Sequence, residues 1–212
     1  MEDIILIGGG GHCKSVIDSI IKSKGYNIVG ILDLHNKVGN EIFGVKVIGT
    51  DDKLKYYYKN GIRNAFLTMG SVGDTRLRRR LCSIALNIGY SFPNIIDSTA
   101  IVSDKIEIGY GNFIGKGTII NSGTKIENNC IINTGAIIEH DCHIKDFCHI
   151  APGVTMSGNV VIGENTHIGT NSTIIQNIVI GNNSIIGAGS VVVKDIKSNI
   201  KAYGNPCKEV KR

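Results

Sequence analysis

The chain has 212 residues, of which 42% are hydrophobic and 19% are charged, and this composition is ordinary for a globular protein large enough to bury a core. Its formal charge of +5 is modest, and no aromatic residues interleave with the arginines at 76–80, so that run predicts a solvated helix face and not a nucleic-acid surface. The 27 glycines and the abundant isoleucine indicate many tight turns and β-structure.

The first residues lack the pattern of a secretion signal, because glycines interrupt the first apolar run after Ile7. No segment contains the eighteen or so consecutive apolar residues that a membrane-spanning helix needs. We therefore expect a cytoplasmic protein without a membrane span, whose six cysteines remain reduced.

The first part of the chain has the pattern of a βαβ nucleotide-binding unit. In order we expect an apolar strand at 3–7, a glycine-rich turn at 8–12, a helix at 15–21 and a second strand at 28–32. Glycines in such a turn let the backbone approach a phosphate, with the helix N-terminus facing the negative charge. Because the spacing does not match GxGxxG, a plain tight turn in a small α/β domain is an equal alternative.

Two further positions should lie at the same edge of this sheet. Asp33 ends the second strand, where a carboxylate can accept hydrogen bonds from a ribose or a base edge. A third strand at 65–69 leads to Gly70, which should lie at the carboxyl ends of the strands as well.

The second part of the chain repeats every six residues. Starting at Ile96, seventeen consecutive sixth positions are aliphatic or Met, and a mostly small residue follows four positions later. A period of six predicts short strands joined by turns, with three hexads forming one coil of a parallel β-helix and neighbouring coils about 4.8 Å apart. We therefore expect an α/β domain over 1–92 and a β-helix with a C-terminal tail over 93–212.

The phase of the repeat separates core residues from candidate functional residues. Cys130, Cys142 and Cys148 fall in the small inward position. Each should be a core residue, with its neighbouring histidine on a different side of the strand, so we expect no metal site.

His140 is the candidate general base. It follows the inward Ile138 by two residues, so its side chain should leave the prism, and Asp141 beside it could hold the imidazole tautomer. One coil is eighteen residues, which stacks Gly158 on His140 and should leave open space beside the base for a pantetheine arm. A turn histidine facing solvent is the alternative.

Several segments together carry a family resemblance. They are GGGGH after the first strand, ILD after the second, MG before the arginine-bearing helix, then FPNIIDSTAIVS, IEHDCHI, FCHIAPG and YGNPCK. Over essentially its whole length the chain resembles the NeuD/PglD type of sugar acetyltransferases. The resemblance implies a left-handed β-helix and a homotrimer with active sites between subunits. It also implies acetyl-CoA in the groove between adjacent helices, with the sugar or nucleotide sugar near the N-terminal domain.

The resemblance assigns roles to single residues. It implies that His140 is the catalytic base with Asp141 as its acidic partner. For acetyl-CoA it implies His149 at the thioester end and Thr170 and Ala188 further along the groove. For the nucleotide sugar it implies Gly10, Gly11, His12, Asp33 and Gly70. The phase also stacks His149 on His167, outside the core.

Three hypotheses about function remain open. The leading one is acetyl-CoA-dependent N-acetylation of the amino group of a UDP-4-amino-4,6-dideoxy sugar for surface glycan synthesis. The rival is O-acetylation of sialic acid or another polysaccharide sugar, because Leu34 and His35 follow Asp33 where the family often has a second acidic residue. The third is non-catalytic, either a β-helix scaffold or a metalloprotein resembling carbonic anhydrase.

Overall fold

The computed structural model describes residues 1–210, and these form two compact units. Unit 1 comprises Met1–Gly70 and Arg76–Ile95, and unit 2 comprises Ser71–Thr75 and the chain from Ile96 onward. The short segment Ser71–Thr75 thus packs with the second unit although its neighbours in sequence belong to the first. No helix within residues 1–210 is long and apolar enough to cross a membrane.

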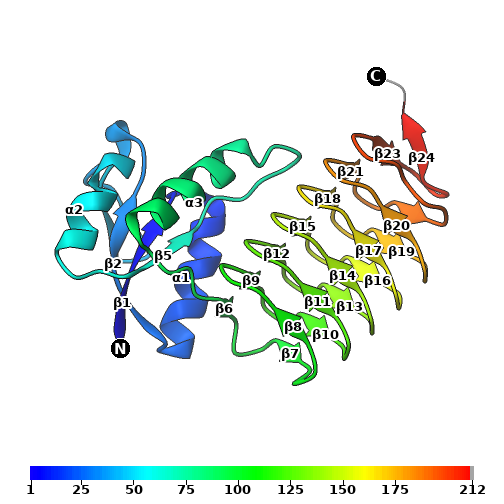
Figure 1. Cartoon of the computed structure of the whole chain (residues 1–212), viewed down its shortest axis with the longest axis horizontal. Coiled ribbons are helices and arrows are strands. Elements are labelled where there is room, and N and C mark those ends of the chain that lie inside the picture. Colours follow the sequence, from blue (N-terminus) through cyan, green and yellow to red (C-terminus); the bar gives the residue numbers. More distant parts are fainter. Residues whose placement is uncertain (211–212) are drawn as a thin grey trace. The chain divides into compact units, whose positions relative to one another are not determined.

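Unit 1 is an α/β fold (Figure 1). Its elements are β1 (Glu2–Ile7), α1 (Gly11–Ser23), β2 (Tyr26–Leu32), η1 (His35–Lys37), β3 (Glu41–Ile42), β4 (Val45–Gly49), η2 (Asp51–Lys53), α2 (Leu54–Lys59), β5 (Asn64–Leu67) and α3 (Arg76–Ile88). The sheet order is β3-β4-β2-β1-β5, and all pairings except β3 with β4 are parallel. The carboxyl ends of β4, β2, β1 and β5 therefore meet at one edge.

The core of unit 1 explains its strand pattern. Residues Ile4 to Ile7 of β1 are fully buried, because helices cover a parallel sheet on both faces and leave no polar face. Helix α3 turns one face inward, and this face includes Arg78, which is only 2% exposed. The expectation of a fully solvated arginine run is wrong at this position, since Arg78 shares its face with Leu81 and Ala85.

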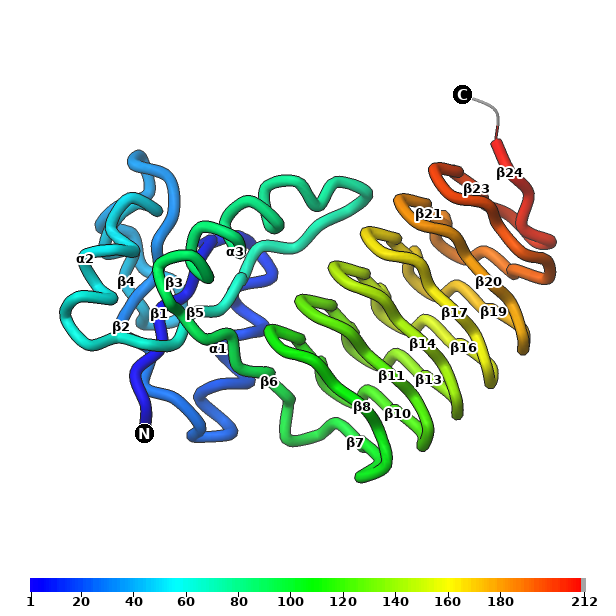
Figure 2. Tube along the Cα trace, viewed as in Figure 1, coloured from blue at the N-terminus to red at the C-terminus, as the bar shows by residue number. Residues whose placement is uncertain are grey.

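Unit 2 is a parallel β-helix with three sheets (Figures 1 and 2). The first sheet contains β6 (Ile95–Ile96), β9 (Phe113–Ile114), β12 (Ile131–Ile132), β15 (His149–Ile150), β18 (His167–Ile168), β21 (Ile185–Ile186), β23 (Lys201–Tyr203) and β24 (Lys208–Val210). The second contains β7 (Ile101–Val102), β10 (Ile119–Ile120), β13 (Ile137–Ile138), β16 (Thr155–Met156), β19 (Thr173–Ile174) and β22 (Val191–Val192). The third contains β8 (Glu107–Ile108), β11 (Lys125–Ile126), β14 (His143–Ile144), β17 (Val161–Ile162) and β20 (Val179–Ile180).

The six-residue phase is confirmed by burial. From Ile114 onward, every residue at the aliphatic position of the hexad is at most 1% exposed. Ile96 departs from the expectation, being 39% exposed, because no coil stacks in front of the first one. At the other end β24 pairs antiparallel with β23 and closes the last coil.

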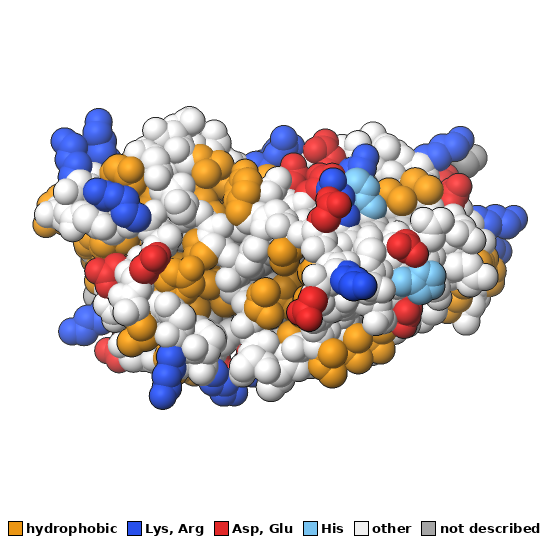
Figure 3. All heavy atoms as spheres, turned by 60° about the horizontal axis from the view of Figure 1, so that its bottom comes forward, with side chains coloured by type: hydrophobic (Ala, Val, Ile, Leu, Met, Phe, Trp, Pro, Cys, Tyr) orange, Lys and Arg blue, Asp and Glu red, His pale blue; other side chains and the backbone are white. Residues whose placement is uncertain are grey.

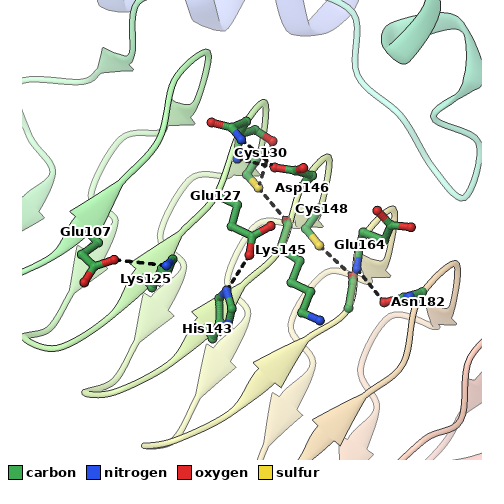
Figure 4. Close-up of polar contacts among 12 residues, drawn as sticks. Glu107, Lys125, Glu127, Cys130, His143, Lys145, Asp146, Cys148, Glu164 and Asn182 are labelled. Atoms are coloured by element: carbon green, nitrogen blue, oxygen red, sulfur yellow. Dashed lines mark hydrogen bonds and ion pairs between the residues drawn. The ribbon is translucent and has the colours of Figure 1, made fainter.

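Many of the small residues at the inward position of the hexad have a chemical role. Its hydroxyl and thiol groups donate to backbone carbonyls fifteen residues further along, as Thr124 does to Glu139 (3.0 Å), Cys148 to Gly163 (3.0 Å) and Ser172 to Gly187 (3.0 Å). These carbonyls lie where the backbone leaves a strand for a turn, so a short side chain with a donor suits the slot, although Ala136, Val154 and Val160 also fill it. Figure 4 shows the inward thiols of Cys130 and Cys148.

Candidate functional site

A hollow of about 240 Å³ lies in unit 1 at the carboxyl ends of the strands. Its floor includes Gly8, Gly9 and Gly10, the turn between β1 and α1. Ideal Cβ atoms built on Gly10 and Gly11 would meet nothing within 4 Å, so open space surrounds the N-terminus of α1. Backbone N–H groups and the helix dipole favour an anion at such a place.

Asp33 is fixed beside the glycine turn. Its Oδ2 accepts hydrogen bonds from the Gly9 N–H (2.6 Å) and the Lys37 ammonium (2.9 Å), and its Oδ1 accepts one from the Leu34 N–H (2.7 Å). A Cβ at Gly9 would lie only 2.7 Å from Asp33 Oδ2, so this position requires glycine. Burial alone would raise the pKa of Asp33, but these hydrogen bonds and the Lys37 charge lower it below its ordinary value.

The expected nucleotide residues are only partly brought together in this hollow. Gly10 and Asp33 line it, whereas Gly11, His12 and Gly70 do not. Gly70 instead lies beside His12, because a Cβ at Gly70 would be 3.8 Å from the His12 Cβ. Lys37 and Asp51 also line the hollow and were missed. The feature that could have identified them is the sheet order, which brings together strand ends that are far apart in sequence.

His140 and Asp141 form a pair at the turn that joins the second sheet of the β-helix to the third. His140 Nδ1 lies 2.8 Å from Asp141 Oδ2, and both side chains are exposed. A proton held on Nδ1 by this carboxylate leaves the Nε2 lone pair free to accept another. Asp141 is in the left-handed region at φ +59°, as Asn and Gly residues are at the equivalent corners.

Two glycines frame the His140–Asp141 pair in the neighbouring coils. A Cβ on Gly158 would lie 2.6 Å from both Cε1 and Nε2 of His140, and a Cβ on Gly123 would collide with the Asp141 carboxylate. The stacking of Gly158 on His140 is therefore as expected, but the expected open space beside the base is wrong. The imidazole itself occupies it, because no side chain at Gly158 holds the ring away.

His149 and His167 stack on the outer face of the first sheet. Their ring centroids are 4.8 Å apart at 70°, and their strands pair in register. His149 Nδ1 lies 2.7 Å from the Ser71 carbonyl oxygen, which can only accept, so Nδ1 carries the proton. Its Nε2 lies 3.3 Å from the Asn133 amide nitrogen and accepts from it. A neutral His149 therefore presents no ring N–H to a thioester oxygen.

His167 lies outside the prism core, as expected, but it is only 8% exposed, which the phase of the repeat did not predict. The segment Ser71–Thr75 accounts for this burial. Thr75 donates to the Asn165 side chain (2.7 Å), and Gly73 packs on Ile185 in the next coil, so the segment contacts residues on both sides of His167. Burial lowers the pKa of His167, which therefore stays neutral at physiological pH.

Thr170 and Ala188 occupy successive coils at the turn that joins the first sheet to the second. The Gly189 N–H donates to the Thr170 carbonyl (2.8 Å), which stacks the two turns directly. Thr170 and Ala188 are both exposed. His140 lies at a different corner of the same prism, namely the corner opposite the sheet that carries His149. One copy of the chain therefore does not bring His140 together with His149, Thr170 and Ala188.

The remaining histidine of the repeat lies on the third sheet. His143 Nε2 is 2.7 Å from Glu127 Oε1, near the Lys125–Glu107 ion pair (3.2 Å), and Figure 4 shows both pairs on this sheet. Within residues 1–210 no group of three or more His, Cys, Asp or Glu side chains is arranged to hold a metal ion. Figure 3 shows acidic, basic and histidine side chains interspersed on the visible face of the β-helix.

Comparison with known families covers both units. Residues 3–85 match the PglD N-terminal domain, and residues 123–158 and 159–194 each match six repeats of the bacterial transferase hexapeptide. Residues 105–140 match the hexapeptide repeat of succinyl-transferase. Among curated protein sequences there is no match.

Solved structures match the chain over its full length. A histidine-to-asparagine variant of perosamine N-acetyltransferase from Caulobacter crescentus, in complex with CoA and GDP-perosamine, is 34% identical, with a TM-score of 0.94 and coverage of 100% of this chain and 98% of that one. The acetyltransferase domain of PglB from Neisseria gonorrhoeae with acetyl coenzyme A is 32% identical, with a TM-score of 0.90 and 99% coverage of both chains. WeeI from Acinetobacter baumannii, at 22% identity and a TM-score of 0.86, shows the fold alone. The expected α/β domain followed by a left-handed parallel β-helix is confirmed.

Proposed function

The chain belongs to the PglD/NeuD-type sugar acetyltransferases, hexapeptide-repeat enzymes that use acetyl-CoA, and from this premise we propose that it acetylates the amino group of a nucleotide-activated aminosugar. The observation that carries the proposal is the His140–Asp141 pair, in which Nδ1 is bonded to a carboxylate and the Nε2 lone pair is left to accept a proton. An amine that attacks a thioester must give up a proton on the way to the amide, and a neutral imidazole can take that proton near pH 7.

We propose direct transfer with His140 as the general base. The sugar amine attacks the thioester carbonyl carbon while His140 Nε2 takes a proton from the nitrogen, and Asp141 stabilises the imidazolium that results. The tetrahedral intermediate then collapses, the C–S bond breaks, and the CoA thiolate leaves and takes up a proton. Because His149 as a neutral ring presents no N–H to the oxyanion, the role left for it is to shape the site beside the thioester.

No cysteine enters this mechanism. Burial raises the pKa of the Cys13 and Cys142 thiols to about 11, and that of Cys148 well above its ordinary value. The thiolate is the nucleophilic form of cysteine, so these groups are inert near neutral pH.

We also propose that the active site forms between copies of the chain in a homotrimer. His140 lies at one corner of the prism, whereas His149 lies on the opposite sheet and Thr170 and Ala188 lie at another corner. This separation within one chain supports the proposal. An apolar row on the second sheet, with Ile101 67% exposed and Ile119 and Ile137 partly exposed, suits a contact with a second copy.

Mixing two inactive variants tests this arrangement. His140→Ala removes the base, and Ala188→Phe blocks the proposed CoA groove, so each variant alone should be inactive. In mixed trimers some sites receive a native His140 from one chain and a native Ala188 from another, and activity should return. If the mixture remains inactive while sedimentation shows mixed trimers, the site lies within one chain.

A thiol-release assay with acetyl-CoA tests the substrate class. The panel is UDP-, GDP- and dTDP-linked 4-amino sugars and free sialic acid. The sequence favours a UDP-linked 4-amino-4,6-dideoxy sugar made for surface glycans, whereas the similar Caulobacter crescentus enzyme was solved with GDP-perosamine. We expect turnover on a nucleotide aminosugar. Turnover on sialic acid alone would overturn the proposal in favour of O-acetylation.

A further inference from the structure

The order of the strands in unit 1 sets the order in which a nucleotide would lie along the sheet edge. The glycine turn follows β1, Asp33 follows β2 and Asp51 follows β4, while the sheet runs β4-β2-β1. Gly10, Asp33 and Asp51 all line the same hollow. A diphosphate at the N-terminus of α1 and a ribose at Asp33 therefore place the base beside Asp51.

Asp33 has little capacity left for a ligand. Three donors of the chain already occupy its two oxygens, two on Oδ2 and one on Oδ1. Each carboxylate oxygen accepts about two hydrogen bonds, so one site on Oδ1 remains, enough for a single ribose hydroxyl. A base edge with several donors needs another acceptor.

Asp51 is that acceptor. Its side chain is partly buried, lines the hollow, and makes no hydrogen bond or ion pair within residues 1–210. Burial, followed by the nearby charge of Asp33, raises the pKa of Asp51. Burial and the neighbouring carboxylate outweigh the attraction of the Arg80 charge, and a ligand with N–H donors would offset that cost.

We propose that Asp51 reads the base of the nucleotide sugar and that this base is guanine. Guanine presents two adjacent donors, N1–H and N2–H, which match the two oxygens of one carboxylate. Uracil and thymine present one N–H between two carbonyl oxygens, so the second carboxylate oxygen would face an acceptor. This inference rests on the proposed function and replaces the UDP-linked sugar that the sequence favours.

Other side chains of the hollow hold a base without distinguishing one base from another. Leu34 and Leu77 line it and are 64% and 56% exposed. Apolar side chains can cover the faces of any flat ring. Discrimination at the base edge therefore falls to Asp51.

Calorimetric titration with nucleoside diphosphates alone tests the inference without any acetyl transfer. We expect GDP to bind about tenfold or more tightly than UDP, with IDP, which lacks the 2-amino group, in between. Asp51→Asn should lose this preference and gain affinity for xanthosine diphosphate, because an amide offers one acceptor and one donor and xanthine has N1–H beside a carbonyl.

Asp52→Asn is the matched control. Asp52 is the next residue, is exposed, and does not line the hollow, so its variant should keep the preference for GDP. The Asp51 side chain makes no hydrogen bond within residues 1–210, although the Arg80 charge attracts it, and an unchanged melting temperature checks that the variant folds. Equal binding of UDP and GDP, unaltered by Asp51→Asn, overturns the guanine inference alone. Failure of every diphosphate to bind overturns it together with the proposed nucleotide-sugar substrate.

Discussion

The β-helix and unit 1 bury their cores by different means. In the β-helix, every coil stacks the same inward aliphatic position on its equivalents eighteen residues away, as Ile132, Ile150 and Ile168 do. In unit 1, each strand has its own neighbours, and Gly9, Asp33 and Lys37 meet only because β1 pairs with β2. In the β-helix, the effect of a substitution should therefore depend on the position of the residue in the hexad. In unit 1, it should depend on the individual partners of the side chain.

His140→Ala should have the largest effect. This effect should come from the individual side chain and not from its position in the hexad. The slot one coil later holds Gly158, so the fold itself needs no side chain there. Because the variant loses the proposed general base, we expect turnover to fall about a hundredfold or more in the thiol-release assay, with acetyl-CoA binding preserved.

His143→Ala is the control for that variant. His143 also points outward from the β-helix, but its partner is Glu127 on the third sheet. Its removal should leave turnover near normal. If both histidine variants behave alike, His140 is not the base.

Ile150→Ala and Ile96→Ala test whether burial or sequence phase sets stability. Both residues occupy the aliphatic position of a hexad, but Ile150 is fully buried and Ile96 is 39% exposed. The first change leaves a cavity and should lower the free energy of unfolding by about 2–5 kcal/mol. The second should cost much less, and urea denaturation measures both. Equal losses would mean that the hexad position alone decides.

The β-helix could be predicted almost residue by residue, because its rule is local. The phase placed Cys130, Cys142 and Cys148 in the core and stacked His149 on His167. It could not predict the burial of His167, since the segment Ser71–Thr75 that covers it comes from far away in sequence.

The hollow in unit 1 was harder to predict, because its chemistry depends on sheet order. Asp33 could be identified from its position at a strand end. The hydrogen bonds that it accepts from Gly9, Leu34 and Lys37 could not be predicted. Asp51 also lies just after a strand, two residues beyond the end of β4. Only the pairing of β2 with β4 shows that this strand end lies beside the first.

Gly158→Ala should have an intermediate effect and tests whether the empty slot positions the base. The added methyl would lie 2.6 Å from the His140 ring, so the imidazole must move while the backbone keeps its conformation. We expect turnover to fall about tenfold, since small misplacements of catalytic groups are costly. Gln176→Ala, at the same corner one coil later, is the control and should leave turnover unchanged. A Gly158→Ala enzyme with normal turnover would show that the ring position seen here is not needed.

Asp33→Asn should have the smallest effect and tests a stabilising contact that depends on individual partners. The pKa of Asp33 is below its ordinary value of 3.8, so its ionised form stabilises the fold at neutral pH. This contribution is present above about pH 4 and is lost as the pH falls through the lowered pKa of the folded state. At pH 7 the variant should melt about 2–4 °C lower, because it loses a partly exposed ion pair and the negative charge that strengthens two hydrogen bonds from backbone N–H groups. The difference from the native chain should shrink on acidification below pH 4.

Asp3→Asn, at an exposed carboxylate bonded to Asn27, is the control and should show little change at any pH. A melting difference for Asp33→Asn that stays constant from pH 7 to pH 3 would mean that charge is not the source of its stabilisation.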